Sequence, residues 1–175
     1  AITLGERYSL PPGFESEIGL AARGWAAEWG RLLSRGALLL LDYGFPQREF
    51  YHPQRGRGTL MCHYRHHAHT DPFLWPGLQD ITAHVDFTAI IAAAHGAGLD
   101  LLGYTSQSQF LLNCGILDRL AELPAGSPAY VRATAAVSQL LMPHEMGELF
   151  KVMALGRGLE DSLPGFQQGD RSHRL

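Results

Sequence analysis

The sequence predicts an α/β fold, and three observations carry that prediction. An uninterrupted apolar run over residues 37–41 ends in Asp42-Tyr43-Gly44, as expected for a strand that is buried on both faces of a parallel sheet. Apolar residues three and four positions apart precede this run, so a helix leads directly into the strand. Helical and strand-like segments then alternate further along the chain, which is typical of α/β domains.

The bulk composition is that of one globular domain. The chain has 175 residues, of which 46% are hydrophobic and 18% charged, and a chain of this length buries about 70% of the surface that it exposes when unfolded. Its net charge of −3 offers no overall basic field, so no nucleic-acid partner is expected. The longest apolar runs are much shorter than the roughly 20 residues that cross a bilayer, so no membrane partner is expected either.

The first elements are predicted from local patterns. Residues 1–10 alternate weakly, which indicates a strand, and a Pro-Pro-Gly turn ends it. A helix is expected over 16–35, with Ser16 as its N-cap and Gly36 after its last turn. Its apolar side chains fall on one face, which is therefore expected to be buried: Ile18, Ala22, Trp25, Trp29, Leu32 and Leu33.

Capping signals place the elements of the second half. Asp86 is a natural N-cap, Ser127 precedes a proline at a first helical position, and Pro143 stops a helix. The last residues, 158–175, are polar and are expected to lie over the surface. The expected elements are, in chain order, a helix over 86–98, a strand over 99–105, helices over 106–123 and 127–142, and a strand over 149–156.

Residues 45–81 are expected to form a long insertion loop. They contain four prolines and five of the nine histidines, and they show no apolar periodicity. Loops of this length in compact domains are often lids or binding loops. The stretch "RGRGTL" (55–60) resembles a Gly-rich phosphate loop, but no strand leads directly into it and no helix follows. A flexible turn is therefore the preferred interpretation.

The stretch "CHYRHHAHTD" (62–71) gathers residue types that bind zinc. His63 and His67, like His66 and His69, have spacings that would share a helix face. No apolar periodicity indicates such a helix, so we favour a polar loop whose histidines are solvated or bind an anion together with Arg65. No metal site is predicted, and a metal-binding module is kept as an alternative.

Two carboxylates and an imidazole lie close together in "GLQDITAHVDF" (77–87). In one extended segment Asp80, Thr82, His84 and Asp86 would point to the same side. The N-cap interpretation is preferred for Asp86, whereas Asp80 and His84 have no comparable structural role. We expect Asp80 and His84 to be catalytic and Thr82 and Asp86 to contribute to substrate binding.

The end of the first buried strand is a second candidate. Asp42, Tyr43 and Gly44 stand where ligands bind in open α/β sheets, beyond the carboxyl ends of the strands. The same residues also suit a turn, because Gly44 supplies conformational freedom and Asp42 a local hydrogen bond. Both interpretations stay open, and the three residues are candidates for substrate binding.

Four blocks of the sequence resemble the C-terminal half of MidA-type S-adenosylmethionine-dependent methyltransferases. They are "LPPGFESEIGLAARGW", "ALLLLDYGFPQREFYHPQRGRGTLMCHYRHHAHTDPF", "PGLQDITAHVDFTA" and "MGELFKVMALGRG", and the resemblance covers essentially the whole chain. It implies the C-terminal part of a class I (Rossmann-like) methyltransferase fold, with residues 1–175 belonging to a single domain. Residues 37–42 would be its fifth strand, 99–105 and 149–156 its last two strands, the final one antiparallel, and 45–81 an insertion near the active site.

The resemblance also implies a function. The mitochondrial members are protein-arginine methyltransferases and complex I assembly factors, so the expected partner is a protein substrate, with a respiratory complex subunit as the candidate. A bacterial-looking chain is expected in the cytoplasm, whereas the eukaryotic relatives are mitochondrial. Whether the chain forms a homo-oligomer is left open. The alternative is a non-catalytic assembly or docking protein that uses the insertion loop as its binding surface.

The expected cofactor is S-adenosylmethionine. The family's Gly-rich cofactor loop and its acidic ribose-binding residue lie upstream of the segment that this chain resembles, so no cofactor-binding residue is carried over. We expect the N-terminal half to bind the cofactor and this chain to be a fragment that is inactive alone. Methyl transfer to arginine needs a carboxylate to orient the guanidinium and a proton acceptor, for which Asp80 and His84 are the candidates.

Overall fold

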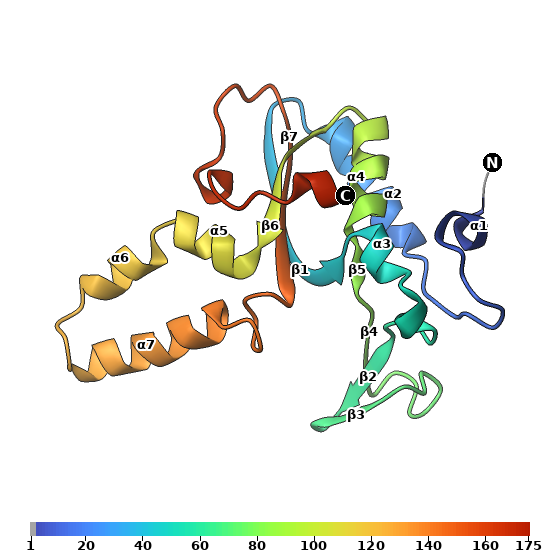
Figure 1. The fold of residues 1–175 in the computed structure, drawn as a ribbon, viewed down its shortest axis with the longest axis horizontal. Helices are drawn as coiled ribbons and strands as arrows, with labels where there is room; N and C mark the ends of the chain where they lie inside the picture. Colours follow the sequence, from blue (N-terminus) through green and yellow to red (C-terminus); the bar gives the residue numbers. More distant parts are fainter. Residues whose placement is uncertain (1–2) are drawn as a thin grey trace.

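The computed structural model describes residues 3–175 and is built on a four-stranded mixed sheet. β7 runs antiparallel to both β1 and β6, so β1 and β6 are parallel to each other, and β5 pairs in parallel with the end of β1. The strands expected over 37–42, 99–105 and 149–156 and the antiparallel direction of the last one are confirmed. The expectation that the first of them is buried on both faces of a parallel sheet was wrong, because β1 pairs antiparallel with β7 and every second side chain from Ala37 to Leu41 is exposed. In sheet order (Figure 1) the strands are β5 (Val85–Asp86), β1 (Gly36–Phe45), β7 (Phe150–Arg157) and β6 (Asp100–Ser106).

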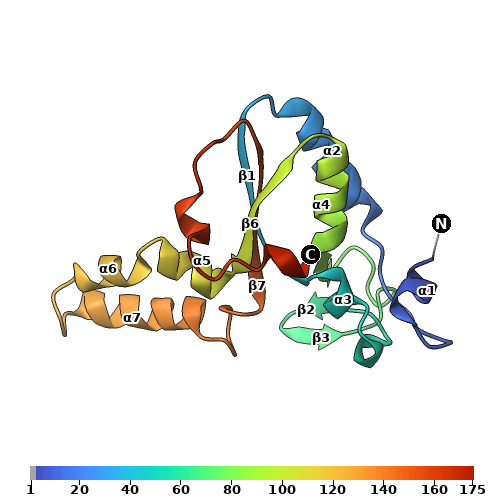
Figure 2. The ribbon, with the colours of Figure 1, turned by 45° about the horizontal axis from the view of Figure 1, so that its top comes forward.

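Helices cover both faces of this sheet. α2 (Leu20–Leu32) and α4 (Phe87–Gly96) lie together on one face (Figure 2), and α5 (Gln107–Asn113) and η2 (Pro164–Phe166) lie on the other. The core is correspondingly divided. Its buried residues on the α4 side are Ala26, Phe87, Ile90, Ala94, Leu99, Tyr104, Met153 and Leu155, and those on the α5 side are Val152, Ala154 and Phe166.

A helical arm projects from the sheet between β6 and β7. It consists of α6 (Ile116–Ala121) and α7 (Pro128–Leu141), neither of which has a buried residue (Figure 1). The prediction of one helix over 106–123 was wrong, because Gly115 adopts a φ of 77° and separates α5 from α6. None of the helices within residues 3–175 combines the length and apolar character that a membrane crossing requires.

The prediction of an irregular loop over 45–81 was wrong. The segment contains α3, a 3-10 turn η1 and a three-stranded sheet in the order β3-β2-β4. Arg65 and His66 join β2 to β3 with φ values of 45° and 68°, a geometry that hairpins usually build from Asn-Gly, so the turn carries no familiar signature. The elements are α3 (Gln47–Phe50), η1 (Pro53–Arg55), β2 (Met61–Tyr64), β3 (His67–His69) and β4 (Asp80–Thr82).

The N-terminal segment is helical, so the strand predicted within residues 1–10 was wrong over its described part, residues 3–10. The helix α1 (Leu4–Tyr8) begins with a reciprocal capping box, in which the Thr3 hydroxyl accepts from the Glu6 amide and the Glu6 carboxylate accepts from the Thr3 amide. These two local hydrogen bonds satisfy two backbone amides and stabilise a helix, whereas the weak alternation of the sequence favours a strand only slightly.

α2 begins four residues later than expected, and it buries a different face. Its N-cap is Gly19 rather than Ser16. It packs on α4 through Ala26 and Gly30, where an added Cβ would lie 2.6 Å from the Cβ of Ala97. Small residues let the two helices approach closely, which leaves Trp25 and Trp29 47% and 38% exposed. The expectation that the tryptophan face is buried was therefore wrong.

The two edges of the sheet differ. β1 pairs on its outer side with β5 only at Gly44 and Phe45, so the rest of that edge is open. Leu39 and Leu41 are 44% and 49% exposed there. Next to this edge lies an apolar hollow of about 450 Å³ between β1 and Trp25. An open apolar edge of this kind favours pairing with another strand.

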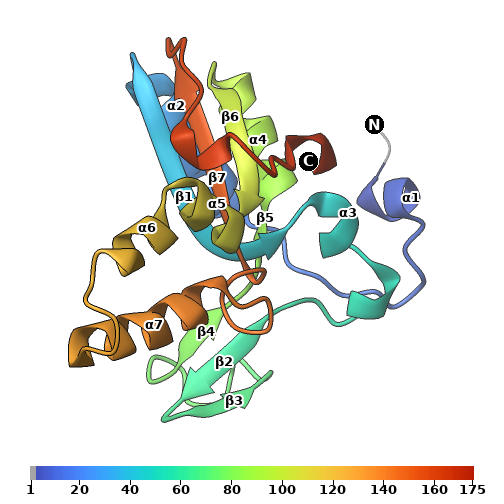
Figure 3. The same cartoon turned by 60° about the vertical axis from the view of Figure 1, so that its left-hand side comes forward.

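The C-terminal tail covers the opposite edge of the sheet. The backbone amide of Tyr104 in β6 donates to the Asp170 carboxylate at 2.9 Å, and the Thr105 hydroxyl donates to the Gly169 carbonyl at 2.7 Å. Figure 3 shows the tail crossing in front of the sheet toward α3. The tail therefore does more than lie over the surface, because Phe166 is buried and the tail protects the edge of β6.

Candidate active site

The carboxyl end of β1 brings an acidic and two aromatic side chains to one edge of the sheet. β1 continues through Phe45, so Asp42, Tyr43 and Gly44 belong to a strand rather than to a turn. Gly44 is buried, and a Cβ there would overlap the Val85 carbonyl, so glycine permits the close pairing with β5. The Asp42 carboxylate accepts one hydrogen bond at 2.8 Å, from the Tyr43 amide.

His84, in the link between β4 and β5, packs into these aromatic rings. Its imidazole stacks on Phe45 with a centroid separation of 5.0 Å and meets the Tyr43 ring edge-on at 5.1 Å. Its backbone amide donates to the Thr59 hydroxyl at 3.0 Å. The Nδ1 atom of His84 is buried and has no hydrogen-bond partner among the described residues. Packing therefore positions the ring, and its Nδ1 atom is available to form a hydrogen bond with another group.

Glu17 fixes the backbone around His84. Its carboxylate accepts from the Thr59 amide at 2.7 Å, from the Leu60 amide at 2.6 Å and from the Thr59 hydroxyl at 3.2 Å. These bonds hold the chain before α2 in an extended conformation, which explains why α2 starts only at Leu20. A carboxylate with this many donors is committed to structure, so Glu17 is a support for His84 rather than a free acid.

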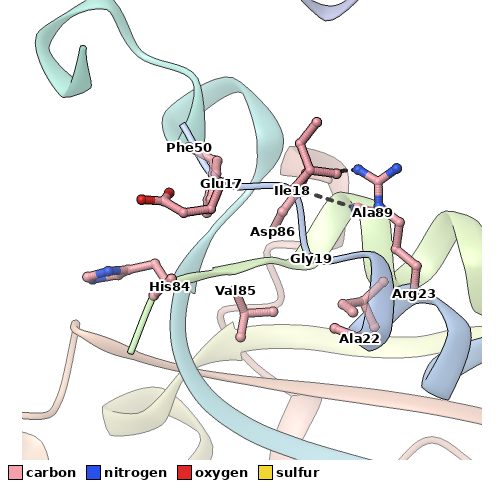
Figure 4. Close-up of a pocket in the computed structure, with 12 residues that line it drawn as sticks. Glu17, Ile18, Gly19, Ala22, Arg23, Phe50, His84, Val85, Asp86 and Ala89 are labelled. Atoms are coloured by element: carbon pink, nitrogen blue, oxygen red, sulfur yellow. Dashed lines mark hydrogen bonds and ion pairs between the residues drawn. The ribbon is translucent and has the colours of Figure 1, made fainter. Parts of the chain in front are cut away.

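A cavity of about 220 Å³ opens beside this support. Figure 4 shows Glu17 and His84 at one end and Arg23 with Asp86 at the other. The Arg23 guanidinium lies 4.0 Å from the Asp86 carboxylate, and its Nε atom is buried with no hydrogen-bond partner among residues 3–175. The lining residues are Glu17, Ile18, Gly19, Ala22, Arg23, Phe50, Ala83, His84, Val85, Asp86, Ala89 and Ile90.

The electrostatic environment keeps His84 neutral. Burial lowers the pKa of its imidazole below the usual 6.5, and the Arg55 cation lowers it further, as Lys151 does to a smaller extent. The carboxylates of Glu17 and Asp42 oppose this and raise the pKa. Burial likewise lowers the pKa of the Lys151 ammonium. A neutral imidazole with a depressed pKa can accept a proton at neutral pH.

The residues predicted within 77–87 are divided between two sheets. Asp80 and Thr82 lie on β4, where Asp80 is exposed opposite His63 and the Thr82 hydroxyl donates to the Met61 carbonyl at 3.2 Å. Neither lines the cavity. The expected single extended segment is interrupted between β4 and β5, so the shared face does not form. His84 is instead brought next to Tyr43.

Asp86 is the N-cap of α4, which was the preferred interpretation of this residue. One carboxylate oxygen caps α4 by accepting from the Ala89 amide at 2.9 Å, and the other accepts from the Gln47 side chain at 2.8 Å. Gln47 also donates its backbone amide to the Thr88 hydroxyl at 2.9 Å. These bonds attach α3 to the start of α4, so Asp86 shapes the wall of the cavity.

Sequence reasoning missed the residues that complete the cluster from distant segments. The Arg55 guanidinium lies 3.9 Å from the centre of the Phe45 ring, and its Nε donates to the Glu49 carbonyl at 3.0 Å. Phe150 meets the Tyr43 ring at 5.6 Å and 90°. Arg55 and Phe150 lie far apart in sequence and share no spacing signal with His84. The insertion brings Arg55 to Phe45, and the pairing of β7 with β1 places Phe150 opposite Tyr43.

The histidine-rich segment forms the β2–β3 hairpin, in which Cys62 pairs with His69 and Tyr64 with His67. Within residues 3–175, no group of three or more histidine, cysteine or acidic side chains is arranged to hold a metal ion. "RGRGTL" runs from the end of η1 toward β2 and opens no helix.

Titration of His84 is a direct check on this environment. We expect its NMR resonance, identified by its loss in the His84→Gln variant, to titrate with a midpoint below 6.5, since burial and Arg55 disfavour the cation. The unfolded chain then binds this proton before the folded chain does. The free energy of unfolding therefore decreases as the pH falls from 6.5 through the lowered pKa of His84. Above pH 6.5 the imidazole is neutral in both states, so His84 does not make the stability depend on pH. A midpoint at or above 6.5 would contradict this description.

The order β1-β7-β6, with an antiparallel strand between two parallel ones, is the C-terminal strand arrangement of class I methyltransferases. The comparisons agree. A family model described as S-adenosyl-L-methionine-dependent methyltransferase matches residues 2–105, which is more than half of the chain. The chain belongs to the MidA-type family of S-adenosylmethionine-dependent methyltransferases.

Two kinds of relatives are similar to this chain. A crystal structure of a Burkholderia thailandensis protein bound to S-adenosyl-homocysteine matches with a TM-score of 0.93 and 53% identity, over 96% of this chain and 44% of that one. The mitochondrial protein arginine methyltransferase NDUFAF7 is 37% identical over 123 residues in Mus musculus and 34% identical over 126 residues in Homo sapiens. These matches cover 69% and 70% of this chain, which spans about a quarter of the length of either relative, since 26% of each is covered.

Proposed function

We propose that this chain is the C-terminal part of a methyltransferase domain that transfers a methyl group from S-adenosylmethionine to arginine side chains of a protein. The observation that carries the proposal is the His84 imidazole, which packing and burial hold neutral beside Asp42 at the carboxyl end of β1. The similarity to proteins named as arginine methyltransferases supports the choice of acceptor. Ligands of open α/β sheets bind at this end of the strands.

Each residue of the cluster has a definite task in this proposal. A guanidinium nitrogen that gains a methyl group must release one proton, and His84 accepts it. Asp42, whose carboxylate makes one hydrogen bond among the described residues, orients the guanidinium together with Asp80 from the insertion. Tyr43 and Phe45 fix the imidazole by ring packing. Thr82 and Asp86 then act indirectly, by shaping the backbone on either side of His84.

The cofactor is assigned mainly to residues outside this chain. S-adenosylmethionine, when bound, supplies the methyl group, and the solved relative holds its product S-adenosyl-homocysteine. The family's Gly-rich cofactor loop is expected upstream of the segment that this chain resembles. The contribution of this chain is therefore placed on the acceptor side of the reaction, with 45–81 as the insertion over it and residues 158–175 as the tail that covers β6. This division predicts that the chain is inactive alone.

The partner and the location follow the family resemblance. We propose a protein substrate, with a respiratory complex subunit as the first candidate, and a cytoplasmic location for this bacterial-looking chain. Oligomerisation stays open.

The test is methyl transfer by the complete domain that contains this chain. With isotopically labelled S-adenosylmethionine, we expect label on an arginine-containing peptide and none on the same peptide with lysine in place of arginine. Absence of transfer to any protein acceptor, with cofactor binding intact, would overturn the enzyme proposal.

That outcome would favour the alternative of a non-catalytic docking protein, which one structural observation supports. The insertion carries an apolar tip between β3 and β4, in which Phe73 is 84% exposed and Leu78 is 68% exposed. Exposed apolar clusters of this kind mark protein contacts. A complex that forms without methylation and is lost on Phe73→Ser would support docking.

Asp80→Asn tests the carboxylate from the insertion. We expect kcat/KM to fall about tenfold, because a neutral amide replaces a charge-assisted contact to the guanidinium. Cofactor affinity should stay unchanged. Asp100→Asn is the matched control, since Asp100 is an exposed aspartate at the opposite end of the sheet, where β6 begins. Turnover by Asp80→Asn equal to that of the control would remove Asp80 from the site.

A further inference from the structure

Two hollows lie side by side around α3, and neither shares a lining residue with the His84 cavity. One has a volume of about 440 Å³ and the other about 480 Å³. They share Arg48 and His52, so together they form one groove that runs from α1 past α3 to the C-terminal turn η3 (Ser172–Arg174). Figure 3 shows α1, α3 and the C-terminus next to one another. The residues lining this α3 groove are Arg7, Tyr8, Ser9, Pro46, Arg48, Glu49, Tyr51, His52, Pro53, His173 and Arg174.

The α3 groove is strongly basic in a chain whose net charge is −3. Three arginines and two histidines line it, and Glu49 is its one acidic lining residue. Glu49 is neutralised by Arg174, whose guanidinium lies 2.9 Å from its carboxylate. Arg7 and Arg48 form no ion pair among residues 3–175, and both are exposed. The groove therefore presents positive charge that the described residues do not balance.

Hydrogen bonds and ring packing hold the side chains that line the α3 groove in place without a ligand. The Tyr8 hydroxyl donates to the Gln47 side chain at 2.8 Å and its ring stacks on Tyr51, which ties α1 to α3. His52 Nδ1 accepts from the Gln54 amide at 3.3 Å, so the ring proton is on Nε2, which is free to donate. A preformed set of donors loses little entropy on binding.

We propose that the α3 groove binds a carboxylate-rich polypeptide segment of a partner protein. Arginine and histidine donors in fixed positions suit carboxylates, with which arginine forms forked hydrogen bonds. A single-stranded nucleic acid would need aromatic faces for its bases. The two tyrosine rings in the groove, Tyr8 and Tyr51, stack on each other, and Tyr51 is buried.

The groove also adjoins the proposed active site. α3 starts at Gln47, two residues after Phe45, which stacks on His84. A protein whose arginine reaches the end of β1 would cross α3 next to that point. The identification of the bound segment as part of the methyl acceptor rests on the proposed function, whereas the charge chemistry of the groove does not.

Direct binding tests the inference without any methylation assay. We expect a fluorescein-labelled oligoglutamate peptide to bind this protein by fluorescence anisotropy, with an affinity that falls as salt is raised, and a length-matched oligolysine peptide not to bind. Arg48→Glu and Arg7→Glu should each weaken binding about tenfold, because each reverses an exposed charge in the groove. Neither arginine forms an ion pair with another described residue, so circular dichroism should show an unchanged fold.

Arg132→Glu is the matched control. Arg132 is an exposed arginine on α7, which lies on the opposite side of the molecule from α3 (Figure 1). It should bind the peptide as well as the unaltered protein does. No binding of oligoglutamate, or equal losses in Arg48→Glu and Arg132→Glu, would overturn the inference. Tighter binding of a single-stranded RNA of equal charge that is lost in Arg48→Glu would also overturn it, in favour of nucleic acid.

Discussion

Replacing His84 with asparagine is expected to lower kcat for methyl transfer about 100-fold in the complete domain, with little change in cofactor affinity. The magnitude is that of a lost proton acceptor in general base catalysis. Asparagine keeps a polar side chain near Tyr43 and Phe45 but cannot take up a proton at neutral pH. The measurement is steady-state methylation of an arginine peptide, combined with a separate titration of cofactor binding.

His95→Asn is the control for this substitution. His95 is exposed near the end of α4, away from β1, so its loss should leave kcat unchanged. The pH profile adds a second readout. In the unaltered enzyme kcat should fall as the pH drops through the lowered pKa of His84, because the imidazole then carries a proton. A His84→Asn enzyme with kcat within twofold of the original would exclude His84 as the proton acceptor.

Replacing Arg157 with methionine is expected to lower the free energy of unfolding by about 3 kcal/mol. The guanidinium of Arg157, at the end of β7, donates four hydrogen bonds of 2.8–3.0 Å to backbone carbonyls at the ends of two helices. The C-terminal ends of helices carry partial negative charge and carbonyls without partners in the helix, so one cation stabilises the ends of both helices. The four acceptors are the carbonyls of Gly30 and Leu33 at the end of α2 and of Ala97 and Gly98 after α4.

Thermal and urea unfolding measure this effect. At this chain length, 3 kcal/mol corresponds to a decrease in Tm of roughly 9 °C. Arg31→Met is the control, because Arg31 makes an exposed pair with Glu28 at 2.7 Å, and such pairs contribute about 0.5 kcal/mol. Arg157→Lys should be intermediate, since lysine keeps the charge but cannot reach four acceptors. If Arg157→Met costs no more than Arg31→Met, the shared-cap description is wrong.

The two residues proposed to act on the guanidinium, Asp80 and His84, lie on different parts of the structure. His84 and Tyr43 rest on the sheet and on the Glu17 hydrogen bonds, whereas Asp80 sits on the small sheet of the insertion. Asp80 is held by the pairing of β4 with β2, whereas His84 contacts both the insertion, through Thr59, and the end of β1, through Phe45. Comparing Asp80→Asn with His84→Asn separates these two contributions.

What the sequence determined by itself is the order and type of the central elements. The run 37–41, the Asp86 cap and the Ser127 cap are local signals, and local signals are sufficient for a strand or a helix start. The family blocks fixed the antiparallel last strand. Asp42 and Tyr43 could also be proposed from the sequence, since they stand at the carboxyl end of a strand, where α/β sheets bind ligands. His84 was proposed from a face shared with Asp80, which the structure does not form.

Only the tertiary structure decided which residues act together. Arg55 reaches the Phe45 ring, which stacks on His84, because the insertion folds back on the sheet. Phe150 meets Tyr43 because β7 pairs with β1, and no sequence spacing encodes either approach. The buried face of α2 was set by the fit of Gly30 against Ala97, and its start was set by the Glu17 bonds to residues 59 and 60. Such effects depend on neighbours that are distant in sequence. The apolar pattern that includes Trp25 and Trp29 therefore predicted the wrong buried face of α2, and Ser16 as N-cap predicted the wrong start.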